Sequence, residues 1–482
     1  MTDVRYLTGR QIRDYHPAMD ALPKFISVDD HVIEPAGVWQ DRLPAKHRER
    51  GPRSFRQKGN MNYVGGVFSF EPDENGEVGD WWQFEDLQLP LTRLEAAAGF
   101  PRSDVTVVPI TYEEMRKGCW DRDARLADMD TNWTEKSLCF PSSFVRFCGQ
   151  RFMEAQDKEL ADLCVKAYND WMVEEWCGPS NGRLLPLIII QLWDVEAAAA
   201  EVYRNAARGV HAVCFSEIPP YLGLPSIHTD YWEPLFRACS ETKMTVQMHI
   251  GSSSKMPSTS ADAPAAVGST LTFGNAMSSM TDWLFSGWLA KYPELKLSYS
   301  EGQIGWVPYI VERADKVWEE NRAWGGFGDK VPEPPSTYYY RQIYSCFFDD
   351  VYGLENIEKV GVANACFETD YPHSDSTWPE SAERLAGQLE HLPRETIDAI
   401  THGNAIRLFG FDPFAHHAPE DCTVGALRAR AGHVDVGPVE PRASFVAPER
   451  PLTLLDMLSR AEHPLLDKQA ADEGVAAEQE SA

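Results

Sequence analysis

The sequence predicts a (β/α)8 barrel, and three observations carry this prediction. Eight short apolar runs occur within the first 370 residues, and most are followed by an amphipathic stretch before the next run. Such alternation is typical of parallel α/β proteins, and eight units close a barrel. No GxGxxG loop follows the first run, which counts against a doubly wound open sheet. We expect strands at 24–30, 136–142, 183–191, 209–217, 244–251, 295–301, 342–348 and 363–370.

Several stretches between these runs have the periodicity of amphipathic helices. Their apolar residues recur at helical spacing, so one face of each helix can pack on the sheet. We therefore expect them to form the outer layer of the barrel. The clearest are 157–176, 195–209, 231–243, 280–292 and 307–324.

The longest insertion separates the first two expected strands. Residues 36–135 are rich in Pro, Gly and Trp, and we expect them to fold over the barrel mouth as a cap. The aromatic residues Trp81, Trp82 and Phe84 in this insertion allow two interpretations. They either supply an apolar wall for a substrate or anchor the cap on the barrel.

The two ends of the chain lie outside the expected barrel, which spans residues 24–410. Residues 1–23 form a short N-terminal segment. Residues 411–482 turn to Pro-, Ala-, Arg- and Glu-rich sequence, which predicts an extension that packs on the surface or on a partner, with its last residues disordered. A long extension of this kind favours a homodimer.

The composition excludes some classes of partner. The 482 residues include 73 acidic and 45 basic side chains, a formal net charge of −28, which argues against nucleic acid or an anionic membrane as the main partner. No apolar run of about 18 residues and no signal-peptide pattern is present, so we expect a cytoplasmic protein. The 10 cysteines include no CxxC pair, which predicts buried, reduced thiols.

Potential metal ligands end five of the eight expected strands, where a barrel of this type carries its active site. Residues i and i+2 of a strand share a face, so Asp29 and His31 should both face the barrel axis while Asp30 points away. Each residue alone could be a solvated turn or a helix cap. Carboxylates that converge on one ring repel unless cations neutralise them, so their convergence predicts a metal site. The remaining strand ends carry Glu217, His249, Glu301 and Asp370.

The motifs "DDH" followed by "EP", "MHIG" and "FETDYPHSDSTWP" resemble the amidohydrolase-2 branch of the amidohydrolase superfamily. Members are metal-dependent (β/α)8 barrels, and the resemblance covers roughly Phe25 to Phe411. It implies that Asp29, His31, His249 and Asp370 bind metal. The sixth strand of the family usually carries a histidine, whereas this sequence has Glu301. Glu217 occupies the place of the carboxylate that bridges two metal ions, so the resemblance implies a dinuclear site.

The inferred set of two histidines and four carboxylates favours iron over hydrolytic zinc, with zinc or manganese as alternatives. Its composition is that of di-iron oxygenases, and it resembles the non-haem di-iron monooxygenases of platensimycin and platencin biosynthesis, which act on a diterpenoid acyl thioester. Our first hypothesis is therefore a di-iron monooxygenase of antibiotic biosynthesis. It would use O2, an apolar small-molecule substrate and, as a further candidate partner, an electron donor. We expect Glu217, Glu301 and His373 to take part in catalysis.

The second hypothesis keeps the barrel and the metal but assigns hydrolysis or non-oxidative decarboxylation. His373 and Asp375 would then transfer protons or support a ligand, although Asp375 could instead cap the helix that follows. Glu34 could hydrogen-bond either a ligand or the cap. A non-catalytic scaffold would leave the ring of charges as an unrelieved cost to stability and is the least favoured interpretation.

Overall fold

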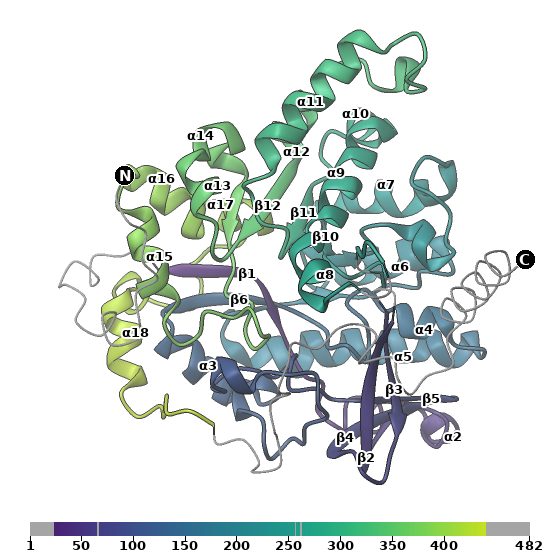
Figure 1. The fold of residues 1–482 in the computed structure, drawn as a ribbon, viewed down its shortest axis with the longest axis vertical. Helices are drawn as coiled ribbons and strands as arrows, with labels where there is room; N and C mark the ends of the chain where they lie inside the picture. The colour runs from purple at the N-terminus through teal and green to yellow at the C-terminus, as the bar shows by residue number, and fades with distance from the viewer. Residues whose placement is uncertain (1–23, 65–66, 256, 261–262, 440–482) are drawn as a thin grey trace, which may run out of the picture.

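The structure is a computed structural model that describes residues 24–64, 67–255, 257–260 and 263–439 (Figure 1). The N-terminal segment 1–23 and residues 440–482 of the expected extension lie outside the described residues.

Parallel strands at eight positions form the barrel that the sequence predicts. They make two hydrogen-bonded sets, in the order β1-β6-β7 and β13-β12-β11-β10-β9-β8. Only Pro186, which lacks an N–H and interrupts the pairing, separates β7 from β8. Since β7 pairs with β6 and β8 pairs with β9, these two short strands occupy one barrel position. The strands are β1 (Phe25–His31), β6 (Thr134–Phe140), β7 (Leu184–Leu185), β8 (Leu187–Ile188), β9 (Ala212–Phe215), β10 (Thr245–His249), β11 (Leu297–Ser300), β12 (Ile343–Phe347) and β13 (Ala365–Phe367).

The barrel closes between β1 and the segment that follows β13. The backbone N–H of Asp370 donates to the carbonyl of Asp29 at 3.0 Å, and the N–H of His31 donates to the carbonyl of Tyr371 at 2.7 Å. Residues from the two ends of the barrel sequence therefore lie side by side. This closure brings Asp29 and Asp370, two of the expected metal ligands, next to each other.

Helices surround the strands as expected, with one correction. The stretch 280–292 is not one helix, because α9 ends before Gly287, whose φ of 88° starts a new helix, α10. The helices are α2 (Ala45–Arg48), α3 (Arg122–Thr131), α4 (Gln150–Glu154), α5 (Lys158–Trp171), α6 (Val195–Ala206), α7 (Glu233–Thr242), α8 (Ala265–Leu271), α9 (Gly274–Ser286), α10 (Trp288–Lys291), α11 (Val307–Glu320), α12 (Pro335–Gln342), α13 (Val351–Glu355), α14 (Ile357–Val360), α15 (Ser381–Leu389), α16 (Arg394–Asp398), α17 (Asn404–Phe409) and α18 (Val424–Ala431).

The insertion after β1 contains a four-stranded antiparallel sheet in the order β3-β2-β4-β5, at the lower right of Figure 1. Its strands are β2 (Arg53–Val64), β3 (Val67–Pro72), β4 (Glu77–Phe84) and β5 (Leu87–Pro90). The expected range 36–135 also contains α3 and the first two residues of β6, which begins at Thr134.

The aromatic residues of β4 attach this sheet to the barrel. Trp81 and Trp82 are fully buried, and the ring of Trp82 stacks on Phe144 with centroids 5.0 Å apart. Phe84 packs edge-on against Phe152 of α4 at 5.6 Å. Since protein side chains cover these rings, they anchor the insertion and are not available as the wall of a substrate site.

The described part of the C-terminal extension folds back over the barrel. In α18, Leu427 is fully buried, and Arg428 lies over the ring of Trp133 at 4.1 Å. The last described residue, Val439, donates its N–H to the carbonyl of Gly99 in the insertion at 2.7 Å. The extension thus contacts both the barrel and the insertion.

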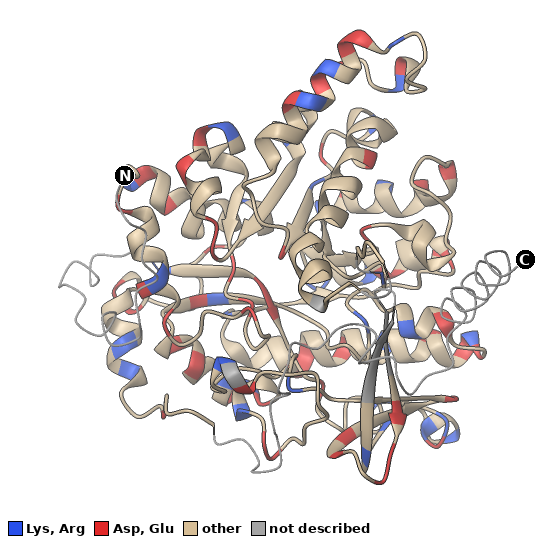
Figure 2. Ribbon diagram, in the orientation of Figure 1, with Lys and Arg blue, Asp and Glu red and all other residues tan. Residues whose placement is uncertain are grey.

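Charged residues of both signs lie on the outer helices, with many more acidic than basic positions along the chain (Figure 2). All 10 cysteines are buried and unpaired, as predicted. Among the described residues, none of the helices combines the length and the apolar character needed to span a membrane.

Candidate metal centre

Four side chains bring potential ligand atoms to within 4.8 Å of one another at the carboxyl ends of the barrel strands. They are His31 at the end of β1, His249 at the end of β10, Glu301 just after β11, and His373 in the loop after β13. Three of the four are buried, and His373 is half-buried. Three of these positions were expected as ligands, whereas the sequence suggested only a catalytic role for His373.

Two aspartates complete this group. Asp29 places its Oδ1 3.6 Å from His31 Nε2 and its Oδ2 3.5 Å from His249 Nε2, and Asp370 Oδ1 lies 3.5 Å from His31 Nε2. Both carboxylates are fully buried, yet none of their four oxygens has a hydrogen-bond partner. Buried polar atoms are nearly always paired, so these oxygens point to a missing partner. We call Asp29, His31, His249, Glu301, Asp370 and His373 the ligand cluster.

The spacing of the donor atoms fits a divalent cation. His31 Nε2 and His249 Nε2 lie 3.0 Å apart, and Glu301 Oε1 lies 3.2 Å from His249 Nε2. Donors bound at about 2.1 Å to one ion are separated by about 3.0–3.5 Å when the angles between them are near 90–110°. The ring of His249 is oriented by its Nδ1, which faces the carbonyl of Ile250 and leaves Nε2 for the cluster.

Burial and like charge both disfavour ionised aspartates in this cluster. Burial raises the pKa of Asp29 well above its ordinary value, and Glu368, Glu301 and Asp370 raise it further. Burial likewise raises the pKa of Asp370, and burial lowers that of His31. Burial also opposes ionisation of Glu301, but the neighbouring histidines outweigh it and hold the pKa of that carboxyl well below its usual range. A bound cation would relieve this crowding of carboxylates.

The backbone around the cluster is strained. Glu301, Asp370 and Phe147 have φ values of 53°, 50° and 50°, in the left-handed region that non-glycine residues rarely adopt. Such conformations cost about 1–3 kcal/mol each and gather at functional sites. Glu301 and Asp370 are both members of the ligand cluster.

Asp30 points away from the axis, as the strand alternation predicts. Its carboxylate accepts hydrogen bonds from the hydroxyls of Ser27, Ser137 and Thr369 and from the backbone N–H of Tyr371. The donors belong to β1, β6 and the segment after β13. Asp30 therefore joins the strands where the barrel closes, and we call these residues the Asp30 cluster.

Glu217 does not join the four-residue group, although it follows β9 as expected. Its Oε1 accepts from the N–H of Gly251 at 3.0 Å, from Ser253 Oγ at 2.8 Å and from Asn275 Nδ2 at 3.2 Å. Burial raises its pKa to about 7. Its other oxygen has no hydrogen-bond partner. These contacts hold the loop that follows His249. The role expected for Glu217, a bridge between two metal ions, stays a prediction.

Glu368 is a further buried carboxylate, which the sequence pattern did not single out. This carboxylate is fully buried after β13, where its Oε2 accepts from the N–H of Glu301 at 3.1 Å while its Oε1 has no partner. The signal was present in the sequence. Glu368 precedes Asp370 by two residues, the same spacing that places Asp29 and His31 on one face.

Two phenylalanines that sequence reasoning did not single out flank the cluster. The ring of Phe147 stacks on His249 with centroids 4.3 Å apart, and that of Phe140 lies 5.1 Å from His249. Phe147 is only half-buried. These rings give the site an apolar side.

The sequence left the contacts of Asp375 and Glu34 open. Asp375 does not cap the following helix, because α15 begins only at Ser381, after Glu380. Glu34 contacts the cap through its backbone, because its carbonyl accepts from the hydroxyl of Tyr112 at 2.6 Å, while its side chain accepts from the N–H of Ser142 at 3.0 Å and from the hydroxyl of Ser142. It therefore ties the end of β1 to the loop after β6.

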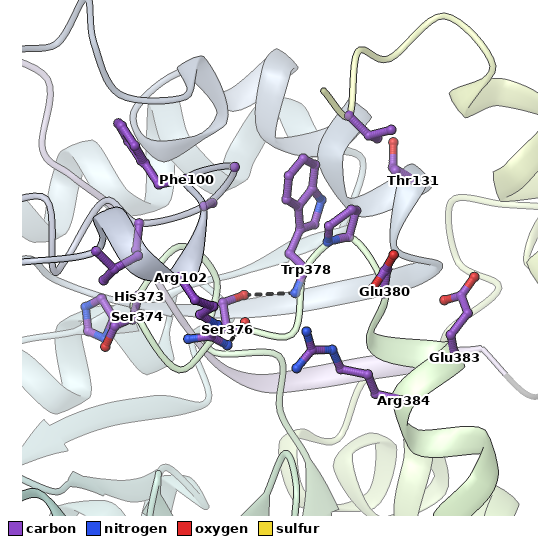
Figure 3. Close-up of a pocket in the computed structure, with 16 residues that line it drawn as sticks. Phe100, Arg102, Thr131, His373, Ser374, Ser376, Trp378, Glu380, Glu383 and Arg384 are labelled. Carbon is purple, nitrogen blue, oxygen red and sulfur yellow. Dashed lines mark hydrogen bonds between the residues drawn. The ribbon is translucent and has the colours of Figure 1, made fainter. Parts of the chain in front are cut away.

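A cavity of about 560 Å³ adjoins the cluster at His373 (Figure 3). Its walls come from the insertion, from the loop after β13, from α15 and from Val436 of the extension. This is the size of a pocket for a small molecule.

Comparisons with known proteins agree with this fold. A family model described as amidohydrolase matches residues 80–411. An amidohydrolase from Mycobacterium avium subsp. paratuberculosis K-10 superposes with a TM-score of 0.59 at 21% identity, covering 80% of this chain and 99% of that one. No curated protein matches the sequence.

Two solved decarboxylases are also similar. The 2,6-dihydroxybenzoate decarboxylase from Rhizobium has a TM-score of 0.53 at 15% identity, over 81% of this chain and 99% of its own. A dihydroxybenzoic acid decarboxylase from Polaromonas sp. JS666, with bound manganese and 2-nitroresorcinol, has a TM-score of 0.53 at 14% identity, over 81% of this chain and 97% of its own. At these identities the likeness shows the fold.

Proposed function

We propose that this chain, which belongs to the amidohydrolase family, is a metal-dependent enzyme that decarboxylates an aromatic acid without an oxidant. The observation that carries the proposal is the set of buried Asp29 and Asp370 oxygens that face histidines and have no hydrogen-bond partner. The similar decarboxylase folds and the manganese bound in one of them support this choice of reaction.

The residues that would hold the ion are Asp29, His31, His249, Glu301 and Asp370. Bound there, a divalent cation would neutralise the carboxylates and orient the substrate carboxylate and a neighbouring phenol-type oxygen. Because carboxylate ligands weaken a metal as an activator of water, this donor set favours decarboxylation over hydrolysis. Manganese suits such a mixed oxygen and imidazole set.

A single ion is the number we propose. Glu217, the expected bridging residue, directs one oxygen into hydrogen bonds with the loop after His249. The group of ligand atoms within 4.8 Å of one another contains His31, His249, Glu301 and His373 and no residue of β9.

His373 is the residue we assign to proton transfer. Its side chain is 16% exposed and lines the cavity, whereas that of His31 is fully buried. Its Nδ1 lies 3.2 Å from Glu301 Oε1 and 3.1 Å from Asp370 Oδ1. Of these two carboxylates, Glu301 accepts a hydrogen bond from Nδ1–H, which orients the ring and leaves Nε2 as the atom that exchanges a proton with the substrate.

The reaction breaks the bond between a ring carbon and the carboxylate, and CO2 leaves. The electron pair stays on the ring carbon, which takes the proton that Nε2 carries when both ring nitrogens of His373 are protonated; the neutral imidazole then regains a proton from solvent. Phe140 and Phe147 would face the aromatic ring of the substrate and keep water away from that carbon.

A di-iron monooxygenase is the second candidate, and one observation favours it. Asp29, Glu301, Glu368 and Asp370 together with three histidines offer more donors than the four to six that one ion usually takes. A second ion near Glu368 would use this surplus. This candidate requires O2, a source of electrons and an apolar substrate.

One experiment separates the two candidates. Purified protein is analysed for metal content, loaded anaerobically with Mn(II) or Fe(II), and supplied with a panel of hydroxybenzoic acids. The proposal expects one ion per chain and release of CO2 in the absence of O2. Two irons per chain, with O2 uptake and no anaerobic release of CO2 from any acid, would favour the monooxygenase.

A further inference from the structure

The cavity beside His373 extends well beyond the ligand cluster. It lies between the insertion, the loop after β13 and α15 (Figure 3). A substrate that places its reacting carbon near His373 would therefore place its remaining part in this cavity. The chemistry of the cavity walls indicates what that part is.

One wall is apolar and fixed. Phe100 and Val105 of the insertion line it together with Trp378. The indole of Trp378 donates its Nε1–H to the carbonyl of Asp128 at 3.0 Å, and the guanidinium of Arg116 covers its ring at 4.1 Å. This wall suits an aromatic or aliphatic body rather than a charged group.

The cavity lining also includes two arginines from distant parts of the chain. Arg102 belongs to a short 3-10 helix (Arg102–Asp104) of the insertion, and Arg384 belongs to α15. Arg102 donates to the carbonyl of Ser376 at 3.0 Å. The guanidinium of Arg384 makes no hydrogen bond or ion pair with a described residue, and Figure 3 shows it directed toward the side of the cavity that holds Arg102 and Ser376.

The two positive charges act on each other. Burial lowers the pKa of Arg102, and the charge of Arg384 lowers it further, although Asp375 and Asp370 act in the opposite direction. Like charges that face one cavity repel unless an anion lies between them.

The acidic residues of the cavity do not pair with these arginines. Glu383 accepts from Arg428 of α18 at 3.4 Å. Glu380 also lines the cavity, but neither glutamate forms an ion pair with Arg102 or Arg384 among the described residues. The planar guanidinium groups therefore remain available to a ligand.

We propose that Arg102 and Arg384 form a subsite for an oxyanion, a carboxylate or a phosphate, on the part of the substrate remote from the reacting carbon. This inference rests on the proposed function, which places the reacting carboxylate at the ligand cluster. The substrate is then an aromatic acid with a second anionic group. A guanidinium fork binds such an oxyanion through two parallel hydrogen bonds.

Binding of small probes tests the subsite without any need for turnover. Titration calorimetry on the metal-loaded enzyme uses isophthalate for the carboxylate, phenyl phosphate for the phosphate and isophthalamide as the neutral control. The variants are Arg102→Gln, Arg384→Gln and Arg384→Lys. Arg313→Gln, which removes an exposed arginine of α11 outside the cavity, is the matched control.

We expect Arg102→Gln and Arg384→Gln to weaken the preferred anion about tenfold or more, with Arg384→Lys in between. Arg313→Gln should bind the anionic probes as tightly as the wild type, and the affinity for isophthalamide should be the same in all variants. The stronger of the two anionic probes identifies the oxyanion. Equal affinities in the wild type and both glutamine variants would overturn the subsite, as would a neutral probe that binds as well as the anions.

Metal content and CO2 release from hydroxybenzoic acids with and without a second carboxylate are measured on the same samples. Loss of anion binding with unchanged metal content supports the subsite whether or not CO2 is released. Absence of CO2 release with intact anion binding counts against the proposed reaction alone. Turnover with no arginine-dependent anion binding counts against the subsite alone.

Discussion

Asp29 and Asp30 are neighbours on β1, and both are buried, yet their surroundings differ completely. Asp30 accepts four hydrogen bonds from the Asp30 cluster, whereas neither oxygen of Asp29 has a hydrogen-bond partner. Burying a carboxylate without such partners costs several kcal/mol. On one face of the strand, the protein itself supplies the hydrogen-bond donors for the carboxylate. On the other face, the carboxylate needs a bound ligand as its partner.

Replacement of Asp29 should have the largest effect on function. In Asp29→Ala the cluster loses a ligand, so metal affinity should fall more than about a hundredfold and CO2 release should fall with it. The fold should survive, because the change removes a buried carboxylate that makes no hydrogen bond. Elemental analysis and circular dichroism measure these two properties. Full metal content in a folded Asp29→Ala variant would contradict the ligand assignment.

Replacement of Asp30 should affect stability instead. Asp30→Ala removes the carboxylate that accepts from the hydroxyls of Ser137, Thr369 and Ser27, and it removes the negative charge that interacts with the buried Arg125. We expect a loss of about 3–5 kcal/mol in the free energy of unfolding, measured with denaturant. Asp30→Asn, which keeps the shape and one acceptor oxygen, should lose less.

The result for Asp30→Ala tests whether the two faces of β1 have separate roles. The strand alternation predicted only that Asp30 points away from the barrel axis. The structure shows that Asp30 joins the strands where the barrel closes. If folded Asp30→Ala lost its metal as completely as Asp29→Ala, the separation between the two faces of β1 would be wrong.

His373 tests whether the half-exposed member of the ligand cluster acts on the substrate. In His373→Gln the proton donor is lost, so CO2 release should fall about a hundredfold or more while metal content stays near the wild-type value. Metal content and turnover are measured together. Loss of the ion in proportion to activity would make His373 a ligand and would give the site three histidines.

The fold and the pair Asp29 and His31 could be predicted because they depend on local periodicity. The spacing of Asp29 and His31 assigns both to the inner face, and eight apolar runs assign the barrel. His249 and Asp370 follow from the same rule, since strand ends of a barrel meet at one edge. The resemblance to the amidohydrolase-2 branch pointed to the same residues.

The remaining features depend on contacts that no periodicity encodes. The loop after β13 turns His373 back over the ring of His31, at 3.4 Å between centroids. The burial of Trp82 against Phe144 depends on how the insertion packs. The cap expected from Asp375 failed because the helix starts later, at Ser381.

Glu34 offers a smaller test on the same segment, between the extremes of Asp29 and Asp30. Among the described residues, its buried carboxylate accepts from the N–H and the hydroxyl of Ser142, which are fewer donors than Asp30 has. Burial raises its pKa from an ordinary value of 4.5 to about 7. Because the folded state then holds the proton more tightly, stability from this group is full below pH 4.5 and is lost as the pH rises to 7.

Glu34→Gln cannot ionise and keeps an oxygen that accepts from the N–H of Ser142. Relative to the wild type, its free energy of unfolding should rise by up to about 3 kcal/mol above pH 7, and the gain should vanish near pH 4. Denaturant unfolding of both proteins at pH 4, 6 and 8 measures this difference. A difference that stays constant over this range would mean that Ser142 supports the ionised carboxylate, so that Glu34 behaves like Asp30 and the contrast on this segment belongs to Asp29 alone.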